Sequence, residues 1–197
     1  TNTKLDNLYK DGLQREQFLP FISIIKEYSI QKELLIKDDY RQQIKEQSKR
    51  VFYPLNEKTN FKVNKYFRQI TKDLTLKEKV LLFKGRKFII KNYFDGIARF
   101  NFKDLCAKNV GAEDYIKIAE KCNFIIIENI PNFNNVNSNQ QQRFITLIDI
   151  IYEKSIPLMI TSQSKIDLLS SSNNLKQSFK RTISRLYELT SVKSNYL

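Results

Sequence analysis

The fold class is decided by residues 124–163, FIIIENIPNFNNVNSNQQQRFITLIDIIYEKSIPLMITSQ. The first eight of them are a short apolar run that ends at a proline, which predicts a buried strand. A polar loop follows, and then a helix over 143–155 with its apolar residues on one face. A second apolar run, 156–163, predicts another buried strand. Strand, helix and strand in this order form a βαβ unit with parallel strands and a right-handed crossover, so the fold class is α/β.

Further strands and helices are predicted on both sides of this unit. The runs KVLLFKG, RKFIIKNYF and GIARFNF (79–85, 86–94 and 96–102) predict strands joined at Gly85 and Gly96, hence a β-hairpin segment. A short strand is expected over 34–37, and Pro20 lies near the expected start of the first helix, where a missing N–H costs little. No internal repeat is evident. The predicted helices cover residues 17–28, 56–71, 111–122 and 175–189.

Composition excludes several classes of protein. The chain has 197 residues, 41% of them hydrophobic, and only four Gly and four Pro, which is enough for a real core without low-complexity sequence. No apolar run approaches the ~18 residues that a membrane helix needs. The first residues do not resemble a signal peptide, there is no starting Met, and we expect the chain to be a piece of something longer. Cys106 and Cys122 lack zinc or CxxC spacing and are expected to be buried thiols.

The charge balance is strongly basic. A formal net charge of +13 permits binding to nucleic acid, acidic lipid or an acidic partner. The basic residues form no single dense patch, so we expect no specific nucleic-acid binding.

Motifs for common chemistry are missing. There is no His, which excludes Cys-His and Ser-His-Asp arrangements. GxxxxGK[ST] and GxGxxG do not occur, so the chain lacks a phosphate cradle of its own. Glu128 ends an apolar strand, as a magnesium-binding acid does, but a core strand with a solvated end is the plainer interpretation. Asp149 lies beside the apolar stripe of its helix, and we expect it to be on the surface or ion-paired.

Arginines are the more informative residues. Arg15 follows a turn and precedes an apolar helix, and its guanidinium is planar, permanently charged and able to bind two phosphate oxygens. Arg181 and Arg185 are spaced i, i+4 on the last helix, so they point to one side. From the residues alone, each of them is better explained as a surface salt-bridge residue than as a phosphate ligand.

Seven ordered strings then give the chain a family resemblance. They are LYKDGLQREQFLPFI, DYR, FYPL, GIARFNFKDLC, EDYIKIA, RFITLIDIIYE and FKRTISRLYEL…NYL, and they span essentially the whole chain. In this order they resemble the C-terminal half or more of the AFG-type ATPases, the ZapE family, which are AAA+-like P-loop ATPases.

The resemblance implies an architecture and roles for four residues. Residues 1–48 would be the end of the ATPase core, and residues 49–197 a mixed α/β region with a β-hairpin segment and a βαβ unit. Asn2 would be a sensor-1 residue, and Arg15 an arginine finger toward a neighbouring subunit. Arg181 and Arg185 would be sensor-2 candidates at the nucleotide. The Walker A and Walker B elements would lie upstream, so residues outside this chain would bind most of ATP and Mg²⁺.

The resemblance also implies a function. The complete, assembled protein would hydrolyse ATP to act on a protein partner, either in cell division with an FtsZ-like machinery or in handling membrane proteins. Such a protein would be a homo-oligomer, cytoplasmic in a bacterium or on the matrix side in mitochondria, with possible peripheral membrane association. This fragment alone would be inactive. The alternative is a non-catalytic basic module that binds a protein or a membrane surface.

Overall fold

The computed structural model describes residues 15–30, 50–83 and 85–192, together with Asp6, Leu8 and Lys10. The chain divides into two compact units, residues 1–39 and residues 40–197, and each is described by itself. The boundary expected at 48/49 and the strand expected over 34–37 lie outside the described residues.

The first unit contains one described helix, α1 (Arg15–Tyr28). Its apolar side chains follow the helical period, with Ile22 buried and the Phe18 and Phe21 rings in contact. The helix starts two residues earlier than expected. Pro20 is therefore inside the helix, where it removes one backbone hydrogen bond, and the expectation that its missing N–H costs little was wrong.

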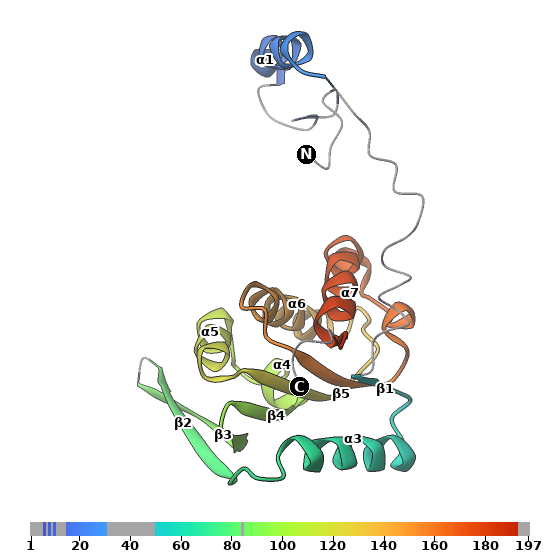
Figure 1. The fold of residues 1–197 in the computed structure, drawn as a ribbon. Coiled ribbons are helices and arrows are strands. Elements are labelled where there is room, and N and C mark those ends of the chain that lie inside the picture. Colours follow the sequence, from blue (N-terminus) through green and yellow to red (C-terminus); the bar gives the residue numbers. More distant parts are fainter. Residues whose placement is uncertain are drawn as a thin grey trace. The chain divides into compact units, whose positions relative to one another are not determined.

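A six-stranded mixed sheet organises the second unit (Figure 1). Its order is β1-β6-β5-β4-β3-β2, and the first four strands of that order are parallel. Strands β4, β3 and β2 are antiparallel neighbours, which confirms the predicted hairpin segment. The strands are β1 (Val51–Phe52), β2 (Lys77–Phe83), β3 (Arg86–Phe94), β4 (Ile97–Asn101), β5 (Phe124–Ile130) and β6 (Leu158–Ser162).

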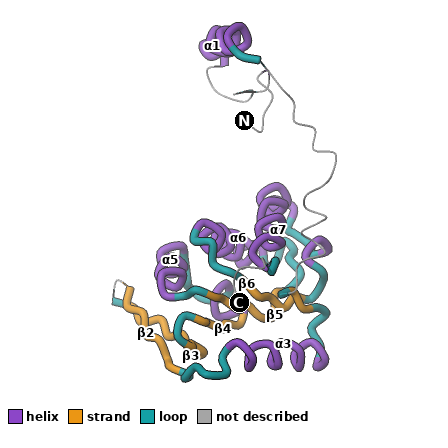
Figure 2. The backbone as a smooth tube through the Cα atoms, viewed as in Figure 1, coloured by secondary structure: helices purple, strands orange, loops and turns teal. Residues whose placement is uncertain are grey.

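Helices cover both faces of this sheet. Figure 2 shows α3 on one face, with α5, α6 and α7 on the other. The connection from β5 through α6 to the parallel strand β6 is the predicted βαβ unit. The helices are α3 (Glu57–Ile70), α4 (Phe102–Cys106), α5 (Ala112–Lys121), α6 (Ser138–Glu153) and α7 (Lys176–Thr190), with three-ten turns η2 (Ile166–Leu168) and η3 (Asn173–Leu175).

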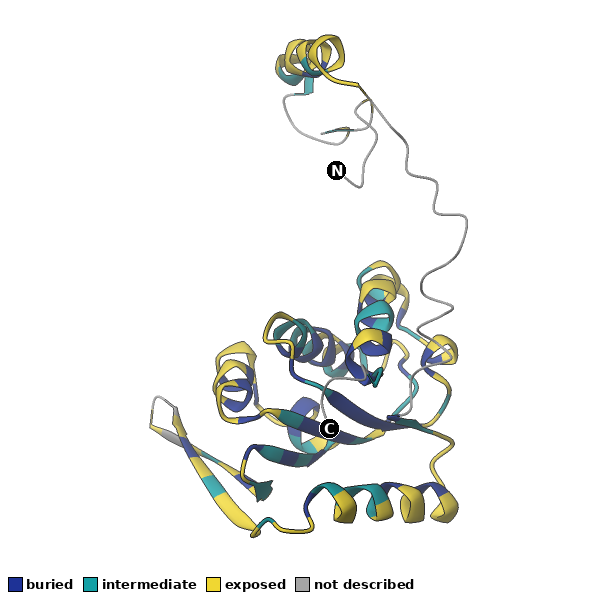
Figure 3. Cartoon of the chain, in the orientation of Figure 1, coloured by how far each residue is buried: buried dark blue, intermediate teal, exposed yellow. Residues whose placement is uncertain are grey.

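Two apolar layers sandwich the central strands, whose buried residues are the dark part of Figure 3. The alternation along β5 sends Ile125 and Ile127 to the layer beneath α5, α6 and α7, and Ile126 to the layer beneath α3. The larger layer includes four packed aromatic rings, namely Phe102, Phe133, Phe144 and Phe179. Side chains on both faces of β5 and β6 are buried, which explains why these strands read as continuous apolar runs.

Helix α6 begins five residues before the predicted start. Its first turns are polar and were expected to be loop, but Gln141 is fully buried there. Its amide donates to the Ser171 hydroxyl at 2.6 Å and accepts from the Ser172 hydroxyl at 2.8 Å. A polar helical turn is stable here because its buried amide is satisfied by the loop before α7.

The two hairpin glycines are explained by the backbone. Gly85 and Gly96 have φ of 81° and 96°, a region that L side chains rarely adopt. A Cβ on Gly96 would also lie 2.6 Å from the Asn123 side chain. The tight turn between β3 and β4 therefore requires glycine at this position.

Both cysteines are free and buried, as the sequence predicts. Burial raises the pKa of each thiol, Cys106 and Cys122, from 9.0 to about 12. A folded-state pKa above the unfolded value contributes stability that is complete below pH 9 and is lost as the pH rises toward 12.

We therefore expect the free energy of unfolding to fall above pH 9, on the order of 1 kcal/mol per pH unit for each thiol. Urea unfolding at pH 8, 9, 10 and 11 measures this slope. The Cys122→Ala variant is the control, since it should show a smaller slope than the parent chain. Equal slopes in the two proteins would contradict the assignment to the thiols.

Candidate functional site

Arg15 lies at the first residue of α1 and caps the turn before it. Its guanidinium donates to the carbonyl oxygens of Asp6 at 2.9 Å and Lys10 at 3.3 Å. The Asp6 carboxylate in turn binds Lys26, and this hydrogen bond lowers the pKa of Asp6. A guanidinium has five N–H donors, and among the described residues these two carbonyl oxygens are its hydrogen-bond acceptors. The side chain is thus held in place by its own turn.

Asn2, the expected sensor-1 residue, lies outside the described residues. Its role stays a prediction from the resemblance.

Arg181 and Arg185 converge on one acid. Both guanidinium groups bind the Asp149 carboxylate of α6, Arg181 at 3.1 Å. Arg185 also lies over the Tyr152 ring at 4.8 Å, and the Tyr152 hydroxyl donates to Glu188 at 2.9 Å. That hydrogen bond raises the pKa of Tyr152.

The expected i, i+4 presentation on one side of α7 is confirmed, and so is the ion-paired interpretation of Asp149. This cluster joins α6 to α7, and a sensor-2 role for either arginine stays a prediction.

The two arginines differ in exposure, and we expect them to differ in energy. The Arg185 side chain is 18% exposed and that of Arg181 is 63% exposed. Arg185→Ala should lower the free energy of unfolding by about 1.5–3 kcal/mol, because Asp149 loses its less exposed partner and Tyr152 loses its stacked cation. Arg181→Ala, the matched control, should change it by less than about 0.5 kcal/mol. Equal losses in chemical denaturation would contradict this ranking.

Glu128 is ion-paired and mostly buried, whereas the plainer interpretation of the sequence expected a solvated strand end. It lies near the carboxyl end of β5 and accepts two hydrogen bonds of 2.7 Å from the Arg99 guanidinium on β4. Arg99 also donates to Asn64 at 2.8 Å and stacks over the Phe67 ring at 4.8 Å, both on α3. The side chains of Arg99 and Glu128 are 20% and 18% exposed. A bidentate pair in this position ties two strands to the helix that covers them.

Sequence reasoning missed this cluster. Arg99 stands in GIARFNF, where the alternation of apolar and polar residues is the only signal. The register that sets Arg99 and Glu128 on neighbouring parallel strands is a property of the sheet.

A pocket of about 520 Å³ adjoins this ion pair. Its lining includes Arg99 and Glu128, as well as the exposed Lys87 and Lys91 of β3. Positive and negative side chains both line this pocket, so its charge does not favour one class of ligand over another.

The described residues do not fit a nucleotide site. In P-loop proteins a glycine-rich loop between a strand and a helix offers its N–H groups to the phosphates. Here the loop from β1 to α3 is Tyr53-Pro54-Leu55-Asn56; it has no glycine, and Pro54 has no N–H. The Asn56 side chain accepts from the Thr59 N–H at 2.9 Å, so it already satisfies one of the donors that an anion would need.

Metal ligands do not gather anywhere in the described part of the chain. Among those residues, no group of three or more His, Cys, Asp or Glu side chains is placed to hold a metal ion. None of the helices in that part is long and apolar enough to cross a membrane.

The fold defines a mixed α/β protein with four parallel strands at its core. Residues 1–196 match the model of the AFG1-like ATPase family, and the chain belongs to that family.

Curated relatives agree with this assignment. The chain is 32% identical over 173 residues to lactation elevated protein 1 homolog B of Danio rerio. The aligned region covers 86% of this chain and 34% of that relative. It is 25% identical over 191 residues to the cell division protein ZapE of Escherichia coli K12, covering 97% of this chain and 51% of the relative. An uncharacterised protein of Schizosaccharomyces pombe is 30% identical over 167 residues. The chain thus spans about a third to a half of these relatives. No solved structure matches it significantly.

Proposed function

We propose that this chain is the C-terminal part of a ZapE-like ATPase that hydrolyses ATP when it is complete and assembled. The match of residues 1–196 to the family model carries the proposal. The chain covers 51% of the Escherichia coli relative, so about half of a protein of that length is left for the residues that bind ATP and Mg²⁺.

Arg15 has a defined role in this proposal. It supplies a fixed positive charge to the transferred phosphoryl group of a nucleotide bound by a neighbouring subunit of a homo-oligomer. The anchored position of its guanidinium, which is bound to the Asp6 and Lys10 carbonyl oxygens, supports that role. Asn2 orients the attacking water, and Arg181 or Arg185 contributes a sensor-2 contact.

Two kinds of action on a protein partner are candidates. One relative is named a cell division protein, which supports action on a division machinery. The other candidate, the handling of membrane proteins, comes from the family resemblance of the sequence. We place the protein in the cytoplasm if the source is a bacterium and on the matrix side of the inner membrane if it is mitochondrial.

A direct test compares two proteins. Phosphate release by the full-length protein should be ATP-dependent, whereas the 197-residue chain alone should neither hydrolyse ATP nor bind it in calorimetry. A micromolar dissociation constant for the isolated chain would contradict the proposal, as would a full-length protein without turnover.

One observation favours a second candidate, a basic binding module. Helix α3 exposes a row of cations on its outer face, and Phe61 among them is 71% exposed. The cations are Lys58, Lys62, Lys65 and Arg68, and the exposed Lys72 follows just after the end of the helix. Sedimentation with vesicles of anionic lipid tests this module, and binding that persists in the isolated chain and disappears with salt would support it.

A further inference from the structure

Two segments near opposite ends of the chain are similar to each other in sequence. Residues 1–28 align without a gap on residues 162–189, at a constant offset of 161. Conservative pairs begin the alignment, Thr1 with Ser162 and Asn2 with Gln163. Seven positions are identical, namely Lys4/Lys165, Asp6/Asp167, Leu8/Leu169, Phe18/Phe179, Ile22/Ile183, Ser23/Ser184 and Glu27/Glu188.

Secondary structure follows the same register. Helix α1 begins at Arg15 and helix α7 begins at Lys176, which are paired positions. Asp6 and Asp167 are paired as well, and both lie in three-ten turns. The alignment rests on the sequence alone. It nevertheless pairs a three-ten turn with a three-ten turn and the first residue of one helix with the first residue of the other.

A tertiary contact also recurs at paired positions. In the first unit Asp6 binds Lys26 of α1. In the second unit the paired residues Asp167 and Tyr187 are hydrogen-bonded, and burial together with the Asp167 charge raises the pKa of Tyr187 to about 12. The same aspartate thus contacts the same helical position in both units, although the partner is a cation in one and a phenol in the other.

In the second unit, strand β6 leads into the aligned segment 162–189, because Ser162 is its last residue. Strand β6 lies between β1 and β5 in the parallel part of the sheet. Strand β1 leads through a four-residue loop into α3, which is the strand–loop–helix order of a P-loop. Strand β5 places Glu128 near its carboxyl end, the edge at which open α/β sheets bind ligands.

We infer that residues 50–192 are a second copy of the ATPase core that ends in residues 1–28, and that this copy has lost its nucleotide site. The inference rests on the proposed function, because the first copy is the ATPase core proposed above. Three features close the second site: a loop without glycine, the Asn56 cap on the Thr59 N–H, and the Arg99 guanidinium on Glu128. This inference replaces the expectation that the chain contains no internal repeat.

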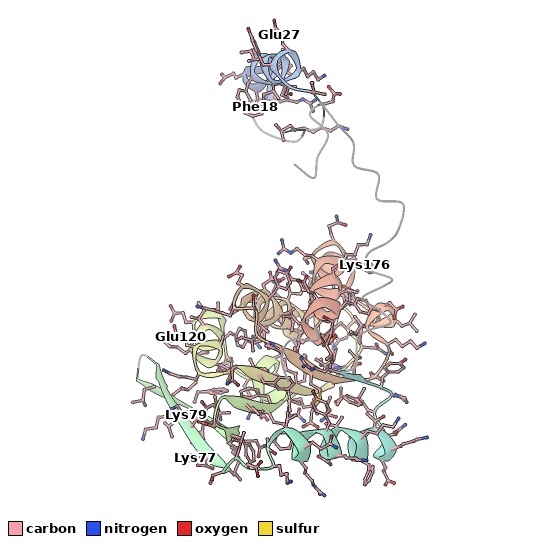
Figure 4. The ribbon with its side chains drawn as sticks, in the orientation of Figure 1. Phe18, Glu27, Lys77, Lys79, Glu120 and Lys176 are labelled. Atoms are coloured by element: carbon pink, nitrogen blue, oxygen red, sulfur yellow. The ribbon has the colours of Figure 1, made fainter. Side chains whose placement is uncertain are left out.

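The paired cations give the sharpest test. Lys176 lies at the start of α7 on the protein surface (Figure 4) and takes the place of Arg15 in the second copy. In the full-length protein, Lys176→Ala should leave the turnover number within about twofold of the parent, whereas Arg15→Ala should nearly abolish turnover. If Lys176→Ala lost as much turnover as Arg15→Ala, the inference that the second copy has no working nucleotide site would be overturned.

Nucleotide stoichiometry separates this inference from the proposed function. Equilibrium dialysis of the full-length protein with Mg·ATPγS should give one nucleotide per chain. Two nucleotides per chain would overturn the inference and leave the ATPase intact. No bound nucleotide at all would contradict the proposed function.

An experimental structure of the full-length protein decides the duplication itself, whatever its nucleotide content. The upstream core should superpose on residues 50–192 with Thr1 on Ser162 and Arg15 on Lys176. A different strand order or a shifted register there would refute the second copy.

Discussion

Replacing Arg15 by alanine in the full-length protein is expected to lower the turnover number by about 10³–10⁵, the range typical of arginine fingers. ATP affinity should change by less than about threefold. The reason is that a finger acts on charge that develops in the transition state, while the ground-state nucleotide is held by other residues. Steady-state phosphate release and fluorescent-nucleotide titration measure the two quantities separately.

The control for this variant must separate chemistry from capping. Arg15 also donates to the Asp6 and Lys10 carbonyls, so its loss could loosen the turn before α1. Arg68→Ala removes another arginine, on α3, and should leave turnover unchanged. Circular dichroism of Arg15→Ala should match the parent. If affinity and helix content fall together with turnover, Arg15 is a structural residue.

A second large effect is expected at Arg99. Arg99→Met should lower the free energy of unfolding by about 2–4 kcal/mol, because it leaves the Glu128 carboxylate largely buried without its cation. Asn64 and the Phe67 ring lose contacts in the same change. Urea unfolding at neutral pH, monitored by circular dichroism, measures this loss.

The double variant Arg99→Met with Glu128→Leu should recover most of that stability. Removing both members of a buried pair avoids the unpaired charge, and apolar replacements of similar volume are often neutral. A double variant as unstable as Arg99→Met alone would show that the ion pair is not the cause. Arg181→Met, at a side chain that is 63% exposed, is the surface control.

The sequence predicts the elements of the second unit well, because their periods are clear. The apolar runs of β5 and β6 and the stripe of α6 gave the βαβ unit that the sheet confirms. Strand β1 was missed because two residues carry no period, and it forms only by pairing with β6. The start of α6 was missed because its polar first turns are stabilised from outside by the loop at Ser171 and Ser172.

The candidate site is less predictable from the sequence for a related reason. Side-chain pairs depend on which strands and helices become neighbours. The i, i+4 spacing predicts that Arg181 and Arg185 share a side of α7, but not that Asp149 of α6 faces them. In the same way, Arg99 and Glu128 are 29 residues apart and meet through the β4–β5 register.

The sheet order determines which strands another molecule could pair with. An open sheet presents unpaired backbone groups along its two outer strands, and another molecule can add a strand there. One outer strand here, β1, is only two residues long and offers almost nothing to pair with. The other, β2, carries Lys77 and Lys79, labelled in Figure 4, and charges of this kind oppose stacking of one copy on the next. Both features therefore oppose the addition of a strand from another molecule at the edges of this sheet.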